Sequence, residues 1–266
     1  MKKFFNFRKG RISYSDEGEG DVLVLVHGYL ETSAIFNNFA GKLAKRFRVI
    51  SVDLPGHGGS DIFGETHTME FMAAAIKDLL ENAATGKIFL TGHSMGGYVT
   101  LAFADLFPEK LNGYCLFHSH PFADTPEVVE RRKMEIRLIN AGTRDMFFEG
   151  SIRKMFATDN IDKFNTELKR SKEISATIPD QAVISVLNGM MVRPSRLYVM
   201  EEGKVPCFWI LGAMDNYIDW YQIQTRVKLP DNARVLVLKN SGHMGFIEEE
   251  ELALEKISEF VIGLRQ

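Results

Sequence analysis

The chain has 266 residues, of which 45% are hydrophobic and 25% are charged, a composition that excludes intrinsic disorder and a long coiled coil. The 32 basic and 35 acidic residues give a formal net charge of −3, and no long basic run is present. Nucleic acid is therefore not an expected partner. The length allows either two domains or a single α/β core that carries an insertion.

The N-terminal segment and the longest apolar runs bear on location. Charge returns at Arg8 before an apolar stretch of signal-peptide length has formed, so mature sequence is expected from the start. Runs such as Val22 to Val26 have the length of a strand, far below the roughly 18 residues of a membrane helix. Cys115 and Cys207 each lie within an apolar run, which favours buried thiols over disulfides or zinc. We expect a cytoplasmic protein with no membrane partner.

Taken in chain order, the elements begin with a hairpin, in which residues 4–7 and 11–15 flank a turn at Arg8-Lys9-Gly10. The run Val22 to Val26 follows without polar alternation, which is typical of a strand covered on both faces. Further buried strands are predicted at residues 48–52, 87–91, 113–117, 206–211 and 234–238. Helical patterns are predicted at residues 33–45, 69–84, 95–107 and 248–264. This alternation predicts an α/β fold.

The stretch 121–204 breaks the alternation, because it contains helical patterns but no convincing buried strand. Its first helix is predicted to start at Asp124-Thr125-Pro126-Glu127 and to stop at Gly142. Further helices are expected at residues 144–157 and 161–177, and after Pro179. We therefore predict a core of residues 1–120 and 205–266 with an inserted helical cap at residues 121–204.

The strongest local signal is Gly92-His93-Ser94-Met95-Gly96-Gly97, which lies between a predicted strand and a predicted helix. A serine there occupies a sharp, strained turn that only small neighbours tolerate. The N-terminal end of the following helix favours negative charge that develops beside Ser94. His93 is expected to point away from the pocket, since its neighbour Ser94 points in. The motif predicts a nucleophilic serine.

A serine hydroxyl is a weak nucleophile, so it needs a base and an acid that orients the base. His243 lies in the loop after the last predicted strand, and Asp215 lies just past the strand that ends at Leu211. Reacting groups in open α/β sheets gather at the carboxyl ends of strands, where all three residues fall. Asp219 lies four residues beyond Asp215 and is an alternative acid.

These motifs together resemble the α/β-hydrolase superfamily, and in particular its capped carboxylesterase and lactonase-like members. His27-Gly28-Tyr29 looks like the oxyanion loop of that family, and the stretch from Asp53 to Ser60 looks like its glycine-rich loop. The resemblance implies a mostly parallel eight-stranded sheet with helices on both faces. It also implies Ser94 as nucleophile, His243 as base and Asp215 as acid, with an oxyanion hole made by the backbone N–H groups of Tyr29 and Met95.

Three further histidines are assigned to the substrate pocket. His27 is expected to shape the oxyanion loop, while His118 and His120 lie where the strand at 113–117 ends and the cap begins. The latter two could share one strand face and bind a metal, but no third ligand has a telling spacing, so we expect no metal.

The sequence thus predicts a serine hydrolase that cleaves a carboxylic ester or a related acyl compound through an acyl-enzyme, without a cofactor. Its partner would be a small acyl substrate. Carbon–carbon bond hydrolysis, thioester hydrolysis and a lyase reaction on the same triad stay open, as does a non-catalytic ligand-binding role. The sequence does not indicate the oligomeric state.

Overall fold

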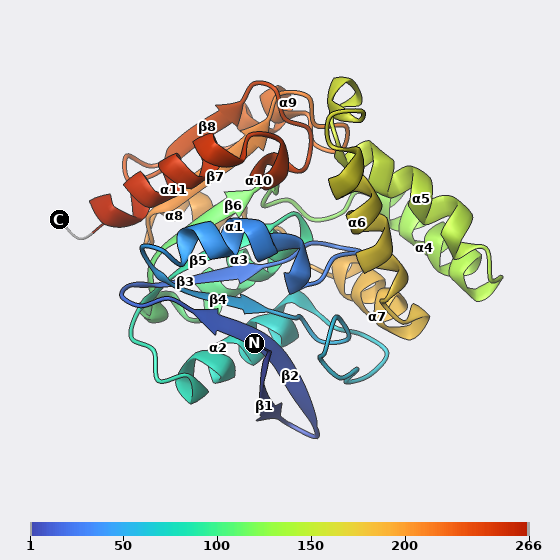
Figure 1. Ribbon diagram of the computed structural model, residues 1–266, viewed down its shortest axis with the longest axis horizontal. Helices are drawn as coiled ribbons and strands as arrows, with labels where there is room; N and C mark the ends of the chain where they lie inside the picture. The colour runs from blue at the N-terminus through green and yellow to red at the C-terminus, as the bar shows by residue number, and fades with distance from the viewer. Residues whose placement is uncertain (1, 265–266) are drawn as a thin grey trace.

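An eight-stranded sheet forms the centre of the protein, in the strand order β1-β2-β4-β3-β5-β6-β7-β8 (Figure 1). The computed structural model describes residues 2–264. The strands are β1 (Lys3–Phe7), β2 (Gly10–Glu17), β3 (Val22–Val26), β4 (Arg48–Val52), β5 (Ile88–His93), β6 (Leu111–Phe117), β7 (Cys207–Gly212) and β8 (Arg234–Leu238). Strand β2 pairs antiparallel with β1 and β4, and every other pair is parallel. The predicted mostly parallel sheet is confirmed.

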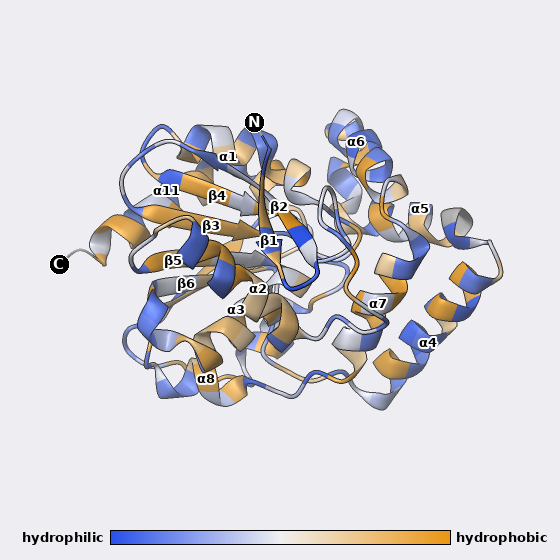
Figure 2. Ribbon diagram, turned by 90° about the horizontal axis from the view of Figure 1, so that it is seen from below, coloured by the Kyte–Doolittle hydropathy of each residue, from blue (hydrophilic) through white to orange (hydrophobic). Residues whose placement is uncertain are grey.

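Helices cover both faces of the sheet, as Figure 2 shows. Helices α1 (Asn37–Leu43) and α11 (Glu250–Gly263) contact each other on one face, and α2 (Met69–Asn82) and α3 (Met95–Leu106) contact each other on the other. The parallel strands β3 and β5 are almost wholly buried between these layers. Such two-sided burial explains their continuous apolar sequence, since neither face of these strands meets water.

A series of helices lies between β6 and β7 in the chain. They are α4 (Pro126–Asn140), α5 (Arg144–Met155), α6 (Asn165–Ala176), α7 (Asp180–Met191) and α8 (Leu197–Glu202). Helix α4 begins as the sequence indicates, because the Thr125 hydroxyl accepts a hydrogen bond from the Val128 N–H and Pro126 occupies the first turn. Helices α4 to α7 lie together at one end of the sheet (Figure 1).

The structure differs from the predicted elements mainly in short helices. The single helix predicted at 33–45 is divided into a 3-10 turn, Ser33–Phe36, and α1. The last predicted helix, residues 248–264, corresponds to α11, and the short helix α10 (Gly245–Glu248) that precedes it was not predicted. The five-residue helix α9 (Trp220–Gln224) was not predicted, because its main local determinant is the Asp219 side chain that accepts a hydrogen bond from the Gln222 N–H.

No helix within residues 2–264 combines the length and the apolar character that crossing a bilayer would require.

Candidate active site

Ser94 lies at the junction of β5 and α3 in a strained backbone conformation, with φ of 50° and ψ of −115°. Such a conformation costs a non-glycine residue about 1–3 kcal/mol. The turn is tight: a Cβ atom added to Gly92 would lie 2.2 Å from the Gly96 carbonyl oxygen, so position 92 requires glycine. The Ser94 side chain is half-buried, and its hydroxyl makes no hydrogen bond to any residue between 2 and 264.

His243 and Asp215 are hydrogen-bonded to each other. Nδ1 of His243 lies 2.7 Å from Oδ2 of Asp215, and the two side chains are only 4% and 1% exposed. The other carboxylate oxygen, Oδ1, accepts hydrogen bonds from the backbone N–H groups of Tyr217 and Ile218 at 2.8 and 3.1 Å. Burial alone raises the pKa of Asp215, but the charge of His243 and hydrogen bonds from His118 and His243 outweigh burial and hold the pKa well below its usual range. The alternative acid, Asp219, is exposed and caps α9.

The Ser94 turn and the His243 loop are in direct contact. Nε2 of His93, the residue before Ser94, lies 2.8 Å from the backbone carbonyl oxygen of His243. The rings of His93 and His243 have their centroids 5.0 Å apart. The loop after β3 joins them, because a Cβ atom added to Gly28 would lie 3.2 Å from the Cβ of Ser94. Three loops at the carboxyl ends of β3, β5 and β8 therefore converge.

Two backbone N–H groups, in the segments after β3 and after Ser94, have no acceptor among the described residues. Within residues 2–264, no protein acceptor is hydrogen-bonded to the N–H of Tyr29 or of Met95. Met95 is the first residue of α3, where the helix leaves its N–H groups without internal partners and carries a partial positive charge. Leu30 has a positive φ of 62°, which marks a tight turn directly after Tyr29. Both N–H groups are therefore available as hydrogen-bond donors, and their role in an oxyanion hole stays a prediction.

The three histidines assigned to a substrate pocket have other surroundings. His27 is fully buried, donates to the Gly28 carbonyl from Nδ1 and accepts from the Leu54 N–H at Nε2. His118 is also fully buried, and its Nε2 accepts from the Gly245 N–H. These ring nitrogens bind backbone groups of the surrounding loops, and the assignment of both residues to a substrate pocket stays a prediction. His120 is half-buried and contacts the Tyr98 hydroxyl at 3.1 Å.

His118, Asp215 and His243 are close enough to hold a metal ion, since their ligand atoms lie within 4.8 Å of one another. Nδ1 of His243 and Nε2 of His118 already take part in hydrogen bonds. Because Nε2 of His118 is an acceptor, its proton is on Nδ1, which lies 3.5 Å from Oδ2 of Asp215. Burial lowers the pKa of His118 to about 4, so the ring is neutral at pH 7. The three side chains therefore form a network of close contacts around Asp215.

Glu248 is a buried residue of the site that the sequence did not reveal. Its carboxylate accepts from the Gly242 N–H at 2.9 Å and from the Ala157 N–H at 2.8 Å. The backbone N–H of His243 in turn donates to the Met155 carbonyl at 2.7 Å. The His243 loop is thus attached to the end of α5 and the turn after it. No local pattern marks Glu248, since its partners Ala157 and Asn160 lie 91 and 88 residues away in the chain.

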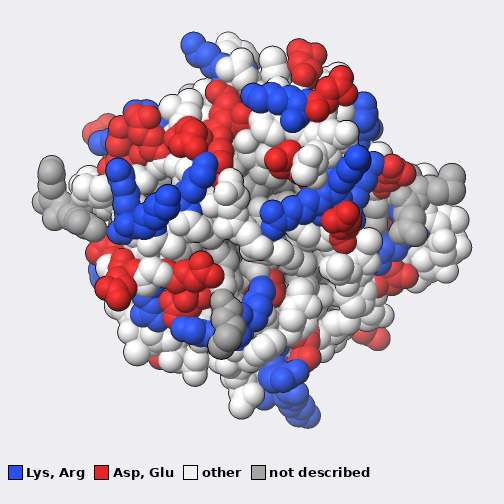
Figure 3. Space-filling view, in the orientation of Figure 1, with Lys and Arg blue, Asp and Glu red and all other residues white. Residues whose placement is uncertain are grey.

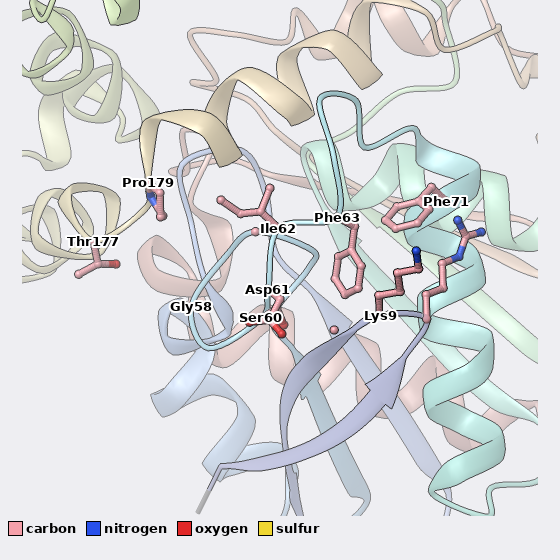
Figure 4. A pocket seen from close by; sticks show the side chains of 12 residues that line it. Lys9, Gly58, Ser60, Asp61, Ile62, Phe63, Phe71, Thr177 and Pro179 are labelled. Carbon is pink, nitrogen blue, oxygen red and sulfur yellow. The ribbon is translucent and has the colours of Figure 1, made fainter.

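A cavity of about 840 Å³ is lined by the β1–β2 turn, the loop around Asp61 and the residues Thr177 and Pro179 (Figure 4). A second cavity of about 380 Å³ includes Lys2 and Ser51. Neither cavity is lined by Ser94, Asp215 or His243. On the face seen in Figure 3, basic and acidic side chains are interspersed, as the small net charge of −3 leads one to expect.

The strained serine after β5 and the His243–Asp215 pair are typical of an α/β hydrolase, and the comparisons show this family. Residues 21–170, more than half of the chain, match the family model described as the alpha/beta hydrolase fold, so the chain belongs to this family. It is 24% identical over 255 residues to a pimeloyl-[acyl-carrier protein] methyl ester esterase of Xanthomonas oryzae, covering 93% of this chain and 97% of that protein.

Solved structures show the same fold over the whole chain. A thermophilic esterase from Thermogutta terrifontis superposes with a TM-score of 0.93 at 24% identity, covering 100% of both chains. The enol-lactonase from Burkholderia xenovorans LB400 superposes with a TM-score of 0.89 at 18% identity, covering 98% of this chain and 100% of the other. The predicted resemblance to esterases and lactonases of the α/β-hydrolase superfamily is confirmed.

Proposed function

We propose that this protein is a serine hydrolase that cleaves carboxylic esters, with Ser94 as nucleophile, His243 as general base and Asp215 as the acid that orients the base. The observation that carries the proposal is the 2.7 Å hydrogen bond between His243 and Asp215 in a loop that contacts the strained Ser94 turn. The related methyl ester esterase and the similar esterase and enol-lactonase structures support an ester substrate.

The protonation of His243 follows from its partner. Asp215 only accepts hydrogen bonds when ionised, so the His243 proton is on Nδ1 and Nε2 has a free lone pair. Nε2 takes the Ser94 proton as the hydroxyl oxygen attacks the ester carbonyl. Catalytic hydrogen bonds are often long before substrate binds, which accounts for the absence of a bond at the Ser94 hydroxyl.

The oxyanion formed by this attack is stabilised by the backbone N–H groups of Tyr29 and Met95. Each such donor contributes about 3 kcal/mol to the stability of the transition state. His243 then gives the proton to the leaving alcohol, and the acyl group stays on Ser94. A water molecule activated by His243 releases the acid and restores the enzyme.

Aromatic side chains near His243 indicate an apolar acyl or alcohol group in the substrate. The Tyr217 ring lies 5.3 Å from the His243 ring, and its hydroxyl donates to the Ser151 carbonyl in α5. The Tyr29 ring contacts Phe148, also in α5, at a centroid distance of 6.3 Å. We therefore assign the helices between β6 and β7 as a cap, residues 121–204, that contributes to substrate binding.

The two cysteines support a reducing, cytoplasmic location for this activity. Cys115 and Cys207 are both buried free thiols. Thiols that have no disulfide partner are common where glutathione and thioredoxin keep them reduced.

A covalent label tests the proposal. A fluorophosphonate probe should attach to Ser94, and a p-nitrophenyl ester should give a burst of p-nitrophenol followed by slower turnover. Ser94→Ala should abolish the label and the burst, whereas Ser258→Ala, which removes a hydroxyl from α11, should preserve both. Label found on another serine, or turnover that survives Ser94→Ala, would contradict the acyl-enzyme and favour lyase chemistry.

A further inference from the structure

A buried acid–base pair lies directly behind the Ser94 turn. Oε2 of Glu31 lies 2.9 Å from Nδ1 of His93 and also accepts a 2.6 Å hydrogen bond from the Gly28 N–H. The side chains of Glu31 and His93 are 3% and 0% exposed. The pair is therefore shielded from water, and each of its contacts is with a segment of the candidate site.

The second ring nitrogen of His93 indicates the protonation state of the pair. Nε2 lies 2.8 Å from the His243 carbonyl oxygen, which only accepts hydrogen bonds, so Nε2 carries a proton. Nδ1 faces a carboxylate oxygen that already accepts from Gly28, as an ionised carboxylate does. Protons on both ring nitrogens satisfy all of these contacts, and the ring is then an imidazolium.

The electrostatics agree with this arrangement. Burial by itself lowers the pKa of His93, but the charge and hydrogen bond of Glu31, together with the His243 carbonyl, outweigh burial and raise that pKa. Burial raises the pKa of Glu31, yet the charge and hydrogen bond of His93 lower it overall. The other titratable groups that face His93 are the rings of His118 and His243 and the carboxylate of Asp215, and the last of these further raises the pKa of His93.

A contribution to folding stability does not by itself explain why Glu31 and His93 form a buried pair. Removing two charges from water often costs as much as their attraction returns, so buried ion pairs contribute little net stability. In addition, Oε1 of Glu31 is buried and has no hydrogen-bond partner among residues 2–264, which is unfavourable. The pair does connect three segments of the candidate site, namely Gly28 in the oxyanion loop, His93 beside Ser94, and the backbone of His243.

We propose that Glu31 and His93 are positioning residues that hold the oxyanion loop and the His243 loop in register with Ser94. This inference rests on the proposed function. Oxyanion-hole donors and the base must lie within a fraction of an ångström of their working positions, and a displacement of 1 Å costs about 100-fold in rate. Loosening the pair should therefore lower kcat rather than weaken substrate binding.

Glu31→Gln tests the role while preserving the size of the side chain. The Gln carbonyl can accept from Gly28, but its neutral amide no longer favours an imidazolium at His93. We expect kcat on a p-nitrophenyl ester to fall about 100-fold, with KM changed by less than about threefold. The matched control is Asp16→Asn, the same carboxylate-to-amide change in an ion pair with Arg48 that connects β2 and β4 outside the site. It should leave kcat unchanged.

NMR of ¹⁵N-histidine-labelled protein gives a readout besides activity. Both ring nitrogens of His93, assigned by their loss in His93→Gln, should be protonated at pH 7.5 in the wild-type protein but not in Glu31→Gln. A neutral His93 in the wild type would overturn the inference. So would a wild-type kcat in Glu31→Gln, or an equal loss of kcat in Asp16→Asn.

Failure of the proposed function is distinguishable from failure of this inference. A wild-type protein that cleaves no ester refutes only the function. The amide signals of Gly28 and His243 then decide the positioning role, because they should shift in Glu31→Gln and stay in place in Asp16→Asn. Unshifted signals in Glu31→Gln would overturn it.

Discussion

Asp215→Asn is predicted to reverse the tautomer of His243. The two oxygens of Asp215 have different partners: Oδ1 accepts from the backbone N–H groups of Tyr217 and Ile218, whereas Oδ2 faces His243. The carbonyl oxygen of Asn must therefore take the Oδ1 position, which directs the NH₂ group at Nδ1 of His243. Nδ1 then has to accept a hydrogen bond, and the proton moves to Nε2.

The magnitude follows from the task of Nε2, which has to receive the Ser94 proton. A triad base in the wrong tautomer loses about 10⁴ in kcat, equivalent to about 5.5 kcal/mol in the activation barrier. The variant should also be less stable by about 1–3 kcal/mol, because the protonated Nδ1 of His118 would face the same NH₂ group, donor against donor.

Steady-state hydrolysis of a p-nitrophenyl ester measures the first effect, and urea unfolding measures the second. Asp219→Asn is the matched control: Asp219 is exposed and caps the short helix α9, so its kcat should stay within about twofold of the wild type. If Asp215→Asn retained more than a tenth of the wild-type kcat while folded, or if Asp219→Asn lost activity instead, the tautomer argument would be refuted.

Three further predictions concern stability. Ser94→Gly should raise the free energy of unfolding by about 1 kcal/mol, because glycine adopts the φ of 50° without strain. Ser94→Ala should give no such increase, and identical thermal unfolding of the two variants would argue against backbone strain at this position. In α7, Gly189→Ala should lower the free energy of unfolding by about 3 kcal/mol, since its Cβ would lie 1.8 Å from the His67 carbonyl oxygen. In α5, the Cβ of Gly150→Ala meets no atom within 4 Å, so this variant should raise the free energy of unfolding by about 1 kcal/mol. Urea unfolding that ranked the two variants in the opposite order would exclude this packing. Burial lowers the pKa of His57 from 6.5 to about 3. As the pH falls below 6.5, the unfolded chain therefore binds a proton at His57 that the folded protein does not bind. The free energy of unfolding should be unaffected by this group above pH 6.5 and should decrease between pH 6.5 and 3, by up to about 1.4 kcal/mol per pH unit. His57→Gln should flatten that slope in urea titrations between pH 6 and 4, and an unchanged slope would be inconsistent with a buried neutral imidazole.

Much of the fold is predictable because its strands carry local signals. The strands Val22–Val26 and Arg48–Val52 have the predicted bounds, since a continuous apolar run between polar loops marks a strand buried on both faces. Short helices are harder to predict. The 3-10 turn at Ser33–Phe36 and the helix α9 span only four and five residues, where side-chain caps decide more than composition does.

The residues of the candidate site were likewise predictable where they carry a local sequence signal. Ser94, Asp215 and His243 were found because each follows a strand whose carboxyl end lies at one edge of the sheet. The sequence favours Asp215 over Asp219 as the partner of His243, and the structure shows the hydrogen bond between Asp215 and His243. Glu31 could not be found at all, because the ring to which it binds is 62 residues away in the chain. No sequence pattern around Glu31 indicates its contact with His93.

The attachment of the His243 loop to the end of α5, through Glu248 and the Met155 carbonyl, restricts how this protein could be redesigned. An engineer who exchanged helices α4 to α7 for those of a relative, to alter substrate preference, would also remove the anchors of the imidazole. A successful chimera would have to recreate an N–H at position 157 and a carbonyl at position 155 in matching places. Helices α4 to α7 and the position of the His243 imidazole therefore cannot be altered independently of each other.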